Sequence, residues 1–148
     1  MDELKTALKI LLANNFVMYF KTHSYHWNIE GIEFSQYHDF FGELYEEVFG
    51  ALDKSAEELR SLDEYAPISL MELYEFKTIQ EDATRPILLV DMLTNLQVAN
   101  NAMVDNLNKV FELASAVNEQ GVADFAAGRL DVHKKHGWMI RSSLKRIG

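Results

Sequence analysis

Side chains able to bind metal are concentrated in the first part of the chain. His23, His26 and His38 lie close together in the sequence, and Asp53 and Glu57 follow on the carboxyl-terminal side of His38. Imidazole nitrogens and carboxylate oxygens are ligands that iron, zinc and manganese accept in proteins. These residue types therefore indicate a metal site.

The helical spacing predicts that His26 faces the interior of the protein. It falls on the apolar stripe of a helix expected at about residues 2–29, where a core would normally place leucine or alanine. The other members of that predicted inward stripe are Leu4, Leu8, Leu11, Leu12, Phe16, Tyr19 and Trp27.

The spacing also predicts that the site is shared between two chains. His38 begins the next helix, and Asp53 and Glu57 project from one face of that same helix, one turn apart. At the rise of an α-helix, His38 and Asp53 are roughly 22 Å apart along the axis, so they cannot bind one ion within one chain. An antiparallel two-fold partner would bring its Asp53 and Glu57 to His38, which gives two identical sites at each interface.

The composition limits the kind of protein and of metal site. With 148 residues, 48% of them hydrophobic, the chain is long enough for one sizeable core, and we expect a single domain over residues 1–148. Zero cysteines exclude disulfides and thiolate-bound metal. We find no secretory signal and no apolar run of about 20 residues, so we expect a cytoplasmic protein.

The net charge argues against nucleic-acid binding. The chain has 14 basic and 23 acidic side chains and a formal charge of −9. Since phosphate contacts supply most of the non-specific affinity for DNA, such a surface repels nucleic acid and attracts cations.

The apolar periodicity predicts an all-α four-helix bundle with a short helix in the crossover between the second and third long helices. Gly31 is expected to end the first helix, Ser35 to cap the second and Pro86 to open the third. The expected helices span about residues 2–29, 35–63, 68–76, 86–114 and 122–146.

The centre of the bundle is predicted to be apolar. A bundle-centre di-iron site uses Glu-x-x-His motifs on two helices and a further glutamate on each of the others. No acidic residue stands three positions before His38, His133 or His136, and Asn100 is the only polar residue on the inward stripe of the third long helix. We therefore expect His133 and His136 to have packing or surface positions.

The segment 23–45, with the pattern HxxHWNxxGxxFxxxHxxFxxxY, is followed by Asp53-x-x-Ala-Glu57. Together they resemble the signature of the Dps mini-ferritins, the DNA-protection-during-starvation proteins. The resemblance implies a ferritin-like fold and a hollow dodecamer that oxidises Fe(II), usually with hydrogen peroxide, and stores ferric iron. It implies that His26 and His38 come from one subunit, and Asp53 and Glu57 from its two-fold mate, as catalytic metal ligands. Iron is the expected metal, with zinc or manganese as possible substitutes.

The chain departs from the family pattern in three places. Gly42 stands where the family usually has an aspartate ligand, and Glu43 or Glu46 is left as a possible replacement. Glu58 replaces the arginine that usually follows Glu57. The lysine-rich arm that holds DNA in many members is absent, so DNA binding is not expected. The alternative function is a metal-sequestering or structural shell with weak or no ferroxidase activity.

Further residues are assigned from the resemblance and from helical position. His23 is expected to pack near the site, and Trp27 to pack at the two-fold interface. Trp138 lies opposite the inward stripe of the last helix, which predicts burial against another subunit. Glu119 and Asp124 fall where the family places a three-fold iron-entry pore.

Overall fold

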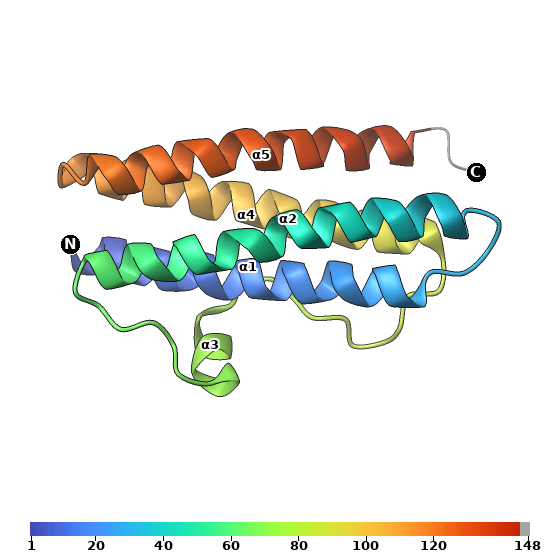
Figure 1. Cartoon of the computed structure of the whole chain (residues 1–148), viewed down its shortest axis with the longest axis horizontal. Helices are drawn as coiled ribbons and strands as arrows, with labels where there is room; N and C mark the ends of the chain where they lie inside the picture. Colours follow the sequence, from blue (N-terminus) through green and yellow to red (C-terminus); the bar gives the residue numbers. More distant parts are fainter. Residues whose placement is uncertain (146–148) are drawn as a thin grey trace.

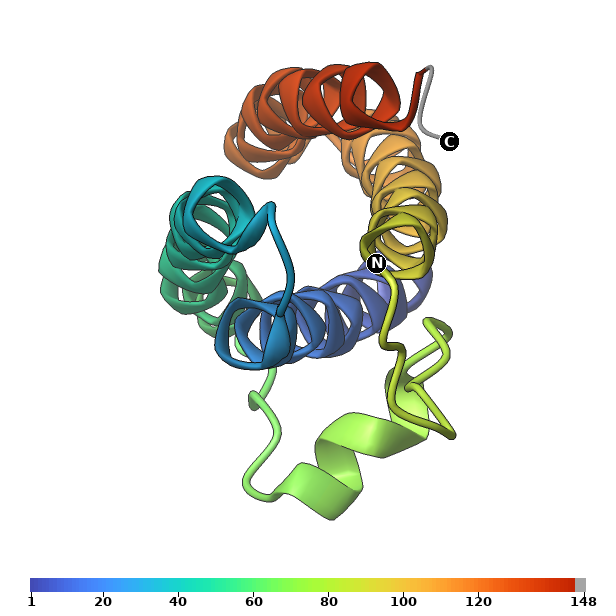
Figure 2. The same cartoon turned by 90° about the vertical axis from the view of Figure 1, so that its right-hand side faces the viewer.

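The computed structural model describes residues 1–145, and four long helices form its bundle. The helices are α1 (Asp2–Asn28), α2 (Phe34–Ser61), α3 (Leu70–Phe76), α4 (Leu89–Ala116) and α5 (Gln120–Leu144). The short helix α3 lies outside the bundle, next to α1, in the crossover between α2 and α4 (Figure 1 and Figure 2). Residues 1–145 contain no strand. These elements confirm the predicted all-α bundle with its crossover helix.

The bundle is built from two antiparallel hairpins. Backbone contact is most extensive between α1 and α2 and between α4 and α5, and α1 also packs along α4. The turn between α1 and α2 contains Gly31, whose φ of +115° lies in a region that favours glycine. This turn brings the end of α1 beside the start of α2, which is where the predicted histidine ligands lie.

One predicted cap and one predicted helix start are wrong. α2 begins at Phe34 with Glu33 as its N-cap, so Ser35 is inside the helix and caps nothing. Pro86 lies before α4, because the N-cap residue Leu88 has an extended backbone and the helix begins only at Leu89. The other helix boundaries lie within two residues of the predicted ones, which is the usual precision of boundaries read from a pattern.

The apolar stripes of the four long helices meet in one core. Leu8, Phe41, Leu96 and Ile140 are among its fully buried side chains and come from α1, α2, α4 and α5 respectively. No helix within residues 1–145 is long and apolar enough to cross a membrane.

The predicted inward position of Trp27 is wrong. At this end of α1 the inward positions belong to Tyr25 and Ile29, and the Trp27 side chain is 55% exposed. His26 is turned about 100° from Tyr25 around the helix, so it lies beside α2 and is only partly buried. The apolar stripe at the end of α1 is therefore offset by one residue from the stripe that the sequence predicts.

Polar side chains of α1 hold the crossover against the bundle. The Asn14 side-chain oxygen accepts hydrogen bonds from the backbone N–H groups of Thr78, at 2.7 Å, and Ile79, at 3.0 Å. Asp82 accepts a hydrogen bond from the Tyr25 hydroxyl at 2.6 Å and pairs with Lys21 at 3.0 Å. Burial, followed by the hydrogen bond to Asp82, raises the pKa of Tyr25, so its hydroxyl stays protonated and keeps donating.

We predict that Asn14→Ala destabilises the fold by about 2–4 kcal/mol, because it leaves two N–H groups of the crossover without their acceptor. Thermal and urea unfolding, followed by circular dichroism at one protein concentration, measures this loss. Asn108→Ala, an exposed change on α4, is the matched control and should stay within about 0.5 kcal/mol of the parent. Equal stability of the two variants would show that Asn14 does not hold the crossover.

Candidate metal centre

His26, near the end of α1, and His38, near the start of α2, form a stacked pair. Their ring centroids are 3.8 Å apart and the rings are inclined by 17°. The His26 Nδ1 atom lies 2.6 Å from the backbone carbonyl oxygen of His38, and the His38 Nδ1 atom lies 2.7 Å from the carbonyl oxygen of His26. Since a carbonyl oxygen only accepts, both Nδ1 atoms carry hydrogen and donate.

These reciprocal hydrogen bonds fix the chemistry of both rings. With Nδ1 protonated, the neutral imidazole has its lone pair on Nε2. Within residues 1–145 neither Nε2 atom of the pair makes a hydrogen bond. Metal-binding histidines usually donate their other ring N–H to a carbonyl or carboxylate, which holds the ring and the tautomer in place. The pair therefore offers two oriented nitrogen ligands.

The helix ends explain why this arrangement forms. The last carbonyl groups of an α-helix have no partner within the helix, and the His26 carbonyl is one of them because α1 ends at Asn28. The His38 side chain supplies that missing donor.

Gly42 makes room for the His26 ring. A Cβ atom at Gly42 would lie 3.1 Å from Cε1 and 3.2 Å from Nδ1 of His26, closer than ordinary van der Waals contact. Residue 42 is one helical turn after His38, so its missing side chain is what lets the His26 ring reach the His38 carbonyl. Gly42 therefore removes a possible carboxylate ligand and at the same time positions a histidine.

His23 is held by aromatic packing beside the pair. Its ring stacks on Tyr45, with centroids 3.8 Å apart and an inclination of 7°, and its centroid lies 4.0 Å from that of the Trp27 ring. The Tyr19 hydroxyl is 3.0 Å from its Nδ1 atom. Burial, and then the neighbouring His26, lower the pKa of His23. This environment agrees with the packing position expected for His23.

The structure does not bring Asp53 and Glu57 to the histidine pair within one chain. Both carboxylates are exposed on α2, Asp53 roughly 22 Å and Glu57 roughly 28 Å along the helix from His38. Within residues 1–145 no three histidine, aspartate or glutamate side chains are placed to hold one metal ion. The site shared between chains, with His26, His38, Asp53 and Glu57 as ligands, therefore remains a prediction.

The two acidic residues near Gly42 differ in position. Glu43 lines a groove between α2 and α5, about 100° around α2 from Gly42. Glu46 is exposed and does not line that groove. Glu46 is therefore the better placed of the two to compensate for Gly42.

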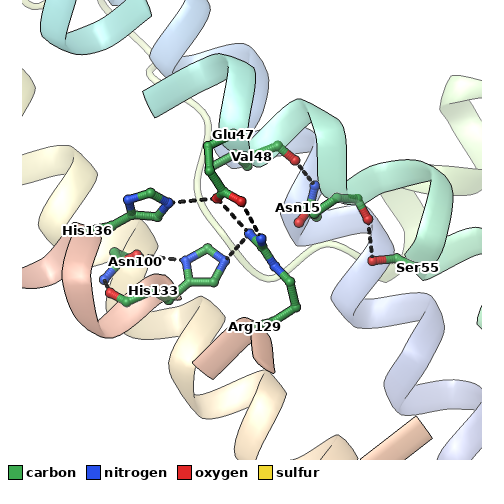
Figure 3. A network of polar contacts seen from close by, with 9 residues as sticks. Asn15, Glu47, Val48, Ser55, Asn100, Arg129, His133 and His136 are labelled. Carbon is green, nitrogen blue, oxygen red and sulfur yellow. Dashed lines mark hydrogen bonds and ion pairs between the residues drawn. The ribbon is translucent and has the colours of Figure 1, made fainter. Parts of the chain in front are cut away.

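The bundle centre contains a polar network, which overturns the prediction of a wholly apolar centre. Arg129 donates to both carboxylate oxygens of Glu47, at 2.5 and 3.0 Å, and the His136 Nε2 atom lies 2.7 Å from the same carboxylate (Figure 3). His133 and Asn100 complete this network, with 2.8 Å between His133 Nδ1 and Asn100 Oδ1. Sequence reasoning missed the network because Glu47 and Arg129 are distant in sequence and neither belongs to a Glu-x-x-His motif.

The network controls the ionisation of two of its members. Burial raises the pKa of Glu47, but the hydrogen bonds from His136 and Arg129 outweigh it and lower that pKa to about 2. Burial, followed by the charge of Arg129, lowers the pKa of His133 to about 3. His133 is therefore neutral, donates from Nδ1 to Asn100 and accepts at Nε2 from Arg129, 3.0 Å away.

Other predicted residues lie at the surface of the chain. Trp138 is 56% exposed, as its position opposite the inward stripe requires, and its packing against another subunit stays a prediction. Glu119 is the N-cap residue of α5 and Asp124 is exposed one turn into that helix. Their assignment to a pore also stays a prediction.

Comparison with known proteins identifies the family. The family model described as a ferritin-like domain matches residues 5–148. An uncharacterized low temperature-induced protein of Nostoc sp. is 32% identical over 136 residues, which cover 90% of this chain and 75% of the relative. DNA protection during starvation protein 2 of Bacillus anthracis is 28% identical, with 96% of this chain and 99% of the relative covered.

Solved structures agree with this assignment. The crystal structure of a Dps protein from Vibrio cholerae, described as a member of a superfamily of ferritin-like diiron-carboxylate proteins, superimposes with a TM-score of 0.93. It is 28% identical, and the match covers 97% of this chain and 90% of that one. The chain therefore belongs to the ferritin-like family and, within it, to the Dps proteins. Membership of this family implies iron binding.

We predict that His133 makes the protein sensitive to acid. Its folded pKa of about 3 lies below the ordinary 6.5, so below pH 6.5 the unfolded chain binds a proton that the folded chain does not. The stability that neutral His133 provides is present above pH 6.5 and is lost as the pH falls towards 3, at up to about 1.4 kcal/mol per pH unit.

Urea unfolding between pH 7 and pH 4 measures this dependence. His133→Gln should be less stable than the parent at pH 7 but should show a shallower fall of the free energy of unfolding with acid. An unchanged slope in the variant would contradict the assignment of a neutral, buried His133.

Proposed function

We propose that this protein is a mini-ferritin that oxidises Fe(II) at sites shared between two chains and stores the ferric product inside a hollow shell. His26 and His38 of one chain and Asp53 and Glu57 of its two-fold mate bind the iron. The reciprocal hydrogen bonds that leave two Nε2 atoms free are the observation that carries this proposal.

The surface around the histidine pair supports the presence of a second chain. Phe20, Trp27 and Phe49 lie on α1 and α2 and are about half exposed, at 48%, 55% and 53%. Aromatic rings are usually buried at subunit interfaces, where they supply much of the contact energy. We propose that a second copy covers them and brings its Asp53 and Glu57 to the pair, and that repetition of this contact builds a dodecamer.

The ligand set suits iron that changes oxidation state. Imidazole nitrogen binds Fe(II), while carboxylate oxygen, a harder ligand, favours Fe(III). Two ferrous ions each give one electron to one molecule of hydrogen peroxide, and with water they yield ferric oxyhydroxide and protons. Zinc and manganese accept the same ligands and are expected to compete with iron.

A second candidate function is a shell that binds metal but turns it over slowly. Gly42 favours it, because each shared site has four protein ligands where the family pattern has one carboxylate more. DNA compaction is not proposed, since the formal charge of −9 repels phosphate.

The shared site predicts complementation between two inactive variants. His38→Ala and Asp53→Ala should each abolish peroxide-driven Fe(II) oxidation, because every site loses one ligand. In a mixed pair of chains one of the two sites regains all its ligands. With random pairing half of the interfaces are mixed, so co-assembly should restore about a quarter of the parent rate.

The absorbance of the ferric product measures this rate, and mixing the assembled variants without unfolding is the control. Absence of recovery in a verified mixed assembly would contradict sharing. Full activity of either single variant would show that the substituted residue is not a ligand of the site.

The contact between Gly42 and His26 predicts how substitutions at position 42 act. Gly42→Ala should slow oxidation by about tenfold, because its Cβ displaces the His26 ring from the His38 carbonyl. Gly42→Asp meets the same contact but adds a carboxylate, so it should be faster than Gly42→Ala. The measurement is the initial rate of Fe(II) oxidation by both variants at the same Fe(II) concentration. If the aspartate variant is no faster than the alanine variant, the iron is not bound next to residue 42.

A further inference from the structure

All four long helices contribute a polar side chain at or near the middle of the bundle. Asn15 of α1 donates to the Val48 carbonyl at 2.8 Å, and Glu47 of α2 and Asn100 of α4 belong to the partly buried polar network (Figure 3). Helix α5 contributes three polar side chains, Arg129, His133 and His136. Burying polar and charged side chains in a core costs folding free energy unless they are paired by hydrogen bonds or ion pairs.

The guanidinium of Arg129 is surrounded as a metal ion would be. Two carboxylate oxygens of Glu47 and the Nε2 lone pair of His133 point at it, with contacts of 2.5 to 3.0 Å. Carboxylate oxygen and imidazole nitrogen are also the ligands of the bundle-centre metal sites of ferritin-like proteins. His136, at 2.7 Å from Glu47, stands at the edge of the same cluster.

The histidine at the centre is oriented by its surroundings. The Asn100 side chain accepts from His133 Nδ1 and donates to the His133 carbonyl at 2.9 Å, so the tautomer with a free Nε2 lone pair is fixed. Gly137 permits this approach, because a Cβ there would lie 3.0 Å from the Asn100 Nδ2 atom. An oriented imidazole of this kind is typical of metal ligands, yet here Arg129 occupies its lone pair.

We propose that the guanidinium of Arg129 takes the place of a metal ion at the bundle centre. While Arg129 lies among them, Glu47, His133 and His136 are not placed to hold one metal ion, and we propose that they can bind divalent metal only when the guanidinium is removed. Arg129 is thus a specificity-determining residue: it restricts metal to sites outside the bundle. The proposal does not depend on the function assigned to the shared site.

Charge explains the exclusion. Glu47 is the one carboxylate of the network, and its charge is balanced by Arg129. A divalent ion at the same place would put two cations within a few ångströms at a partly buried position, where their repulsion is screened less than in bulk water.

The proposed exclusion of metal is not due to a lack of access from solvent. A groove of about 430 Å³ runs between α2 and α5 and is lined by both Glu47 and His136. A hydrated ion can therefore reach the edge of the network from solvent.

Cobalt binding to full-length protein tests the proposal. The background variant carries His38→Ala and Asp53→Ala, which removes the proposed shared site, and Co²⁺ is the probe. With Arg129 present, the bundle centre should bind no Co²⁺. Arg129→Glu, which replaces the guanidinium by a second carboxylate, should bind about one Co²⁺ per chain, with the absorption of a four-coordinate site.

Three variants make the result specific. Arg141→Glu, at an exposed position of α5, makes the same charge change and should bind none. Adding His136→Ala to Arg129→Glu should weaken binding at least about tenfold. Arg129→Gln, a neutral side chain, replaces Arg129→Glu if the latter does not fold, and carries the same expectation of new binding.

Two outcomes overturn the proposal. One is a folded Arg129 variant, with parental helix content, that binds no Co²⁺ or binds it equally well after His136→Ala. The other is stoichiometric binding with Arg129 present that His136→Ala abolishes. Fe(II) oxidation that persists in the background variant contradicts the shared site instead, so failure of the two proposals is distinguishable.

Discussion

The reciprocal hydrogen bonds between His26 and His38 join the end of α1 to the start of α2 and orient both imidazole rings. Each ring donates to the backbone of the other residue and stacks on the other ring, so neither can turn without breaking its own hydrogen bond and the stacking. The exposed aromatic residues and the separation from Asp53 acquire a functional meaning only because the Nε2 atoms of both rings are left without a hydrogen bond within residues 1–145. Gly42 is part of the same arrangement, since it provides the space for the His26 ring.

The protein deals with positive charge in two different ways. At the bundle centre the positive charge belongs to a side chain of the protein, because Arg129 is held there by Glu47 and His133. The imidazoles of His26 and His38 have no such side chain bound to them. Within one chain Asp53 and Glu57 of α2 are too far from these imidazoles to share a metal ion with them. We interpret this contrast as a division between a centre that needs no metal to fold and an interface that takes metal as substrate.

The sequence predicted the helices well because their apolar stripes are long and regular, and local pattern determines them. It failed where position depends on tertiary contacts. The rotation of α1 that exposes Trp27, and the pairing of Glu47 with Arg129, involve residues on helices that meet only in the folded chain. The His26 and His38 pair was predicted from type and spacing, but its hydrogen bonds required the geometry of the turn. The missing carboxylate at Gly42 was visible in the sequence, whereas its contact with His26 was not.

Anomalous diffraction at the iron absorption edge, from crystals soaked in Fe(II), tests the central claim most directly. The account predicts an iron peak bound by the Nε2 atoms of His26 and His38 and by Asp53 and Glu57 of a two-fold mate, with no peak among Glu47, His133 and His136. A peak at the bundle centre, or an ordered two-fold interface that holds iron away from these four ligands, would contradict it.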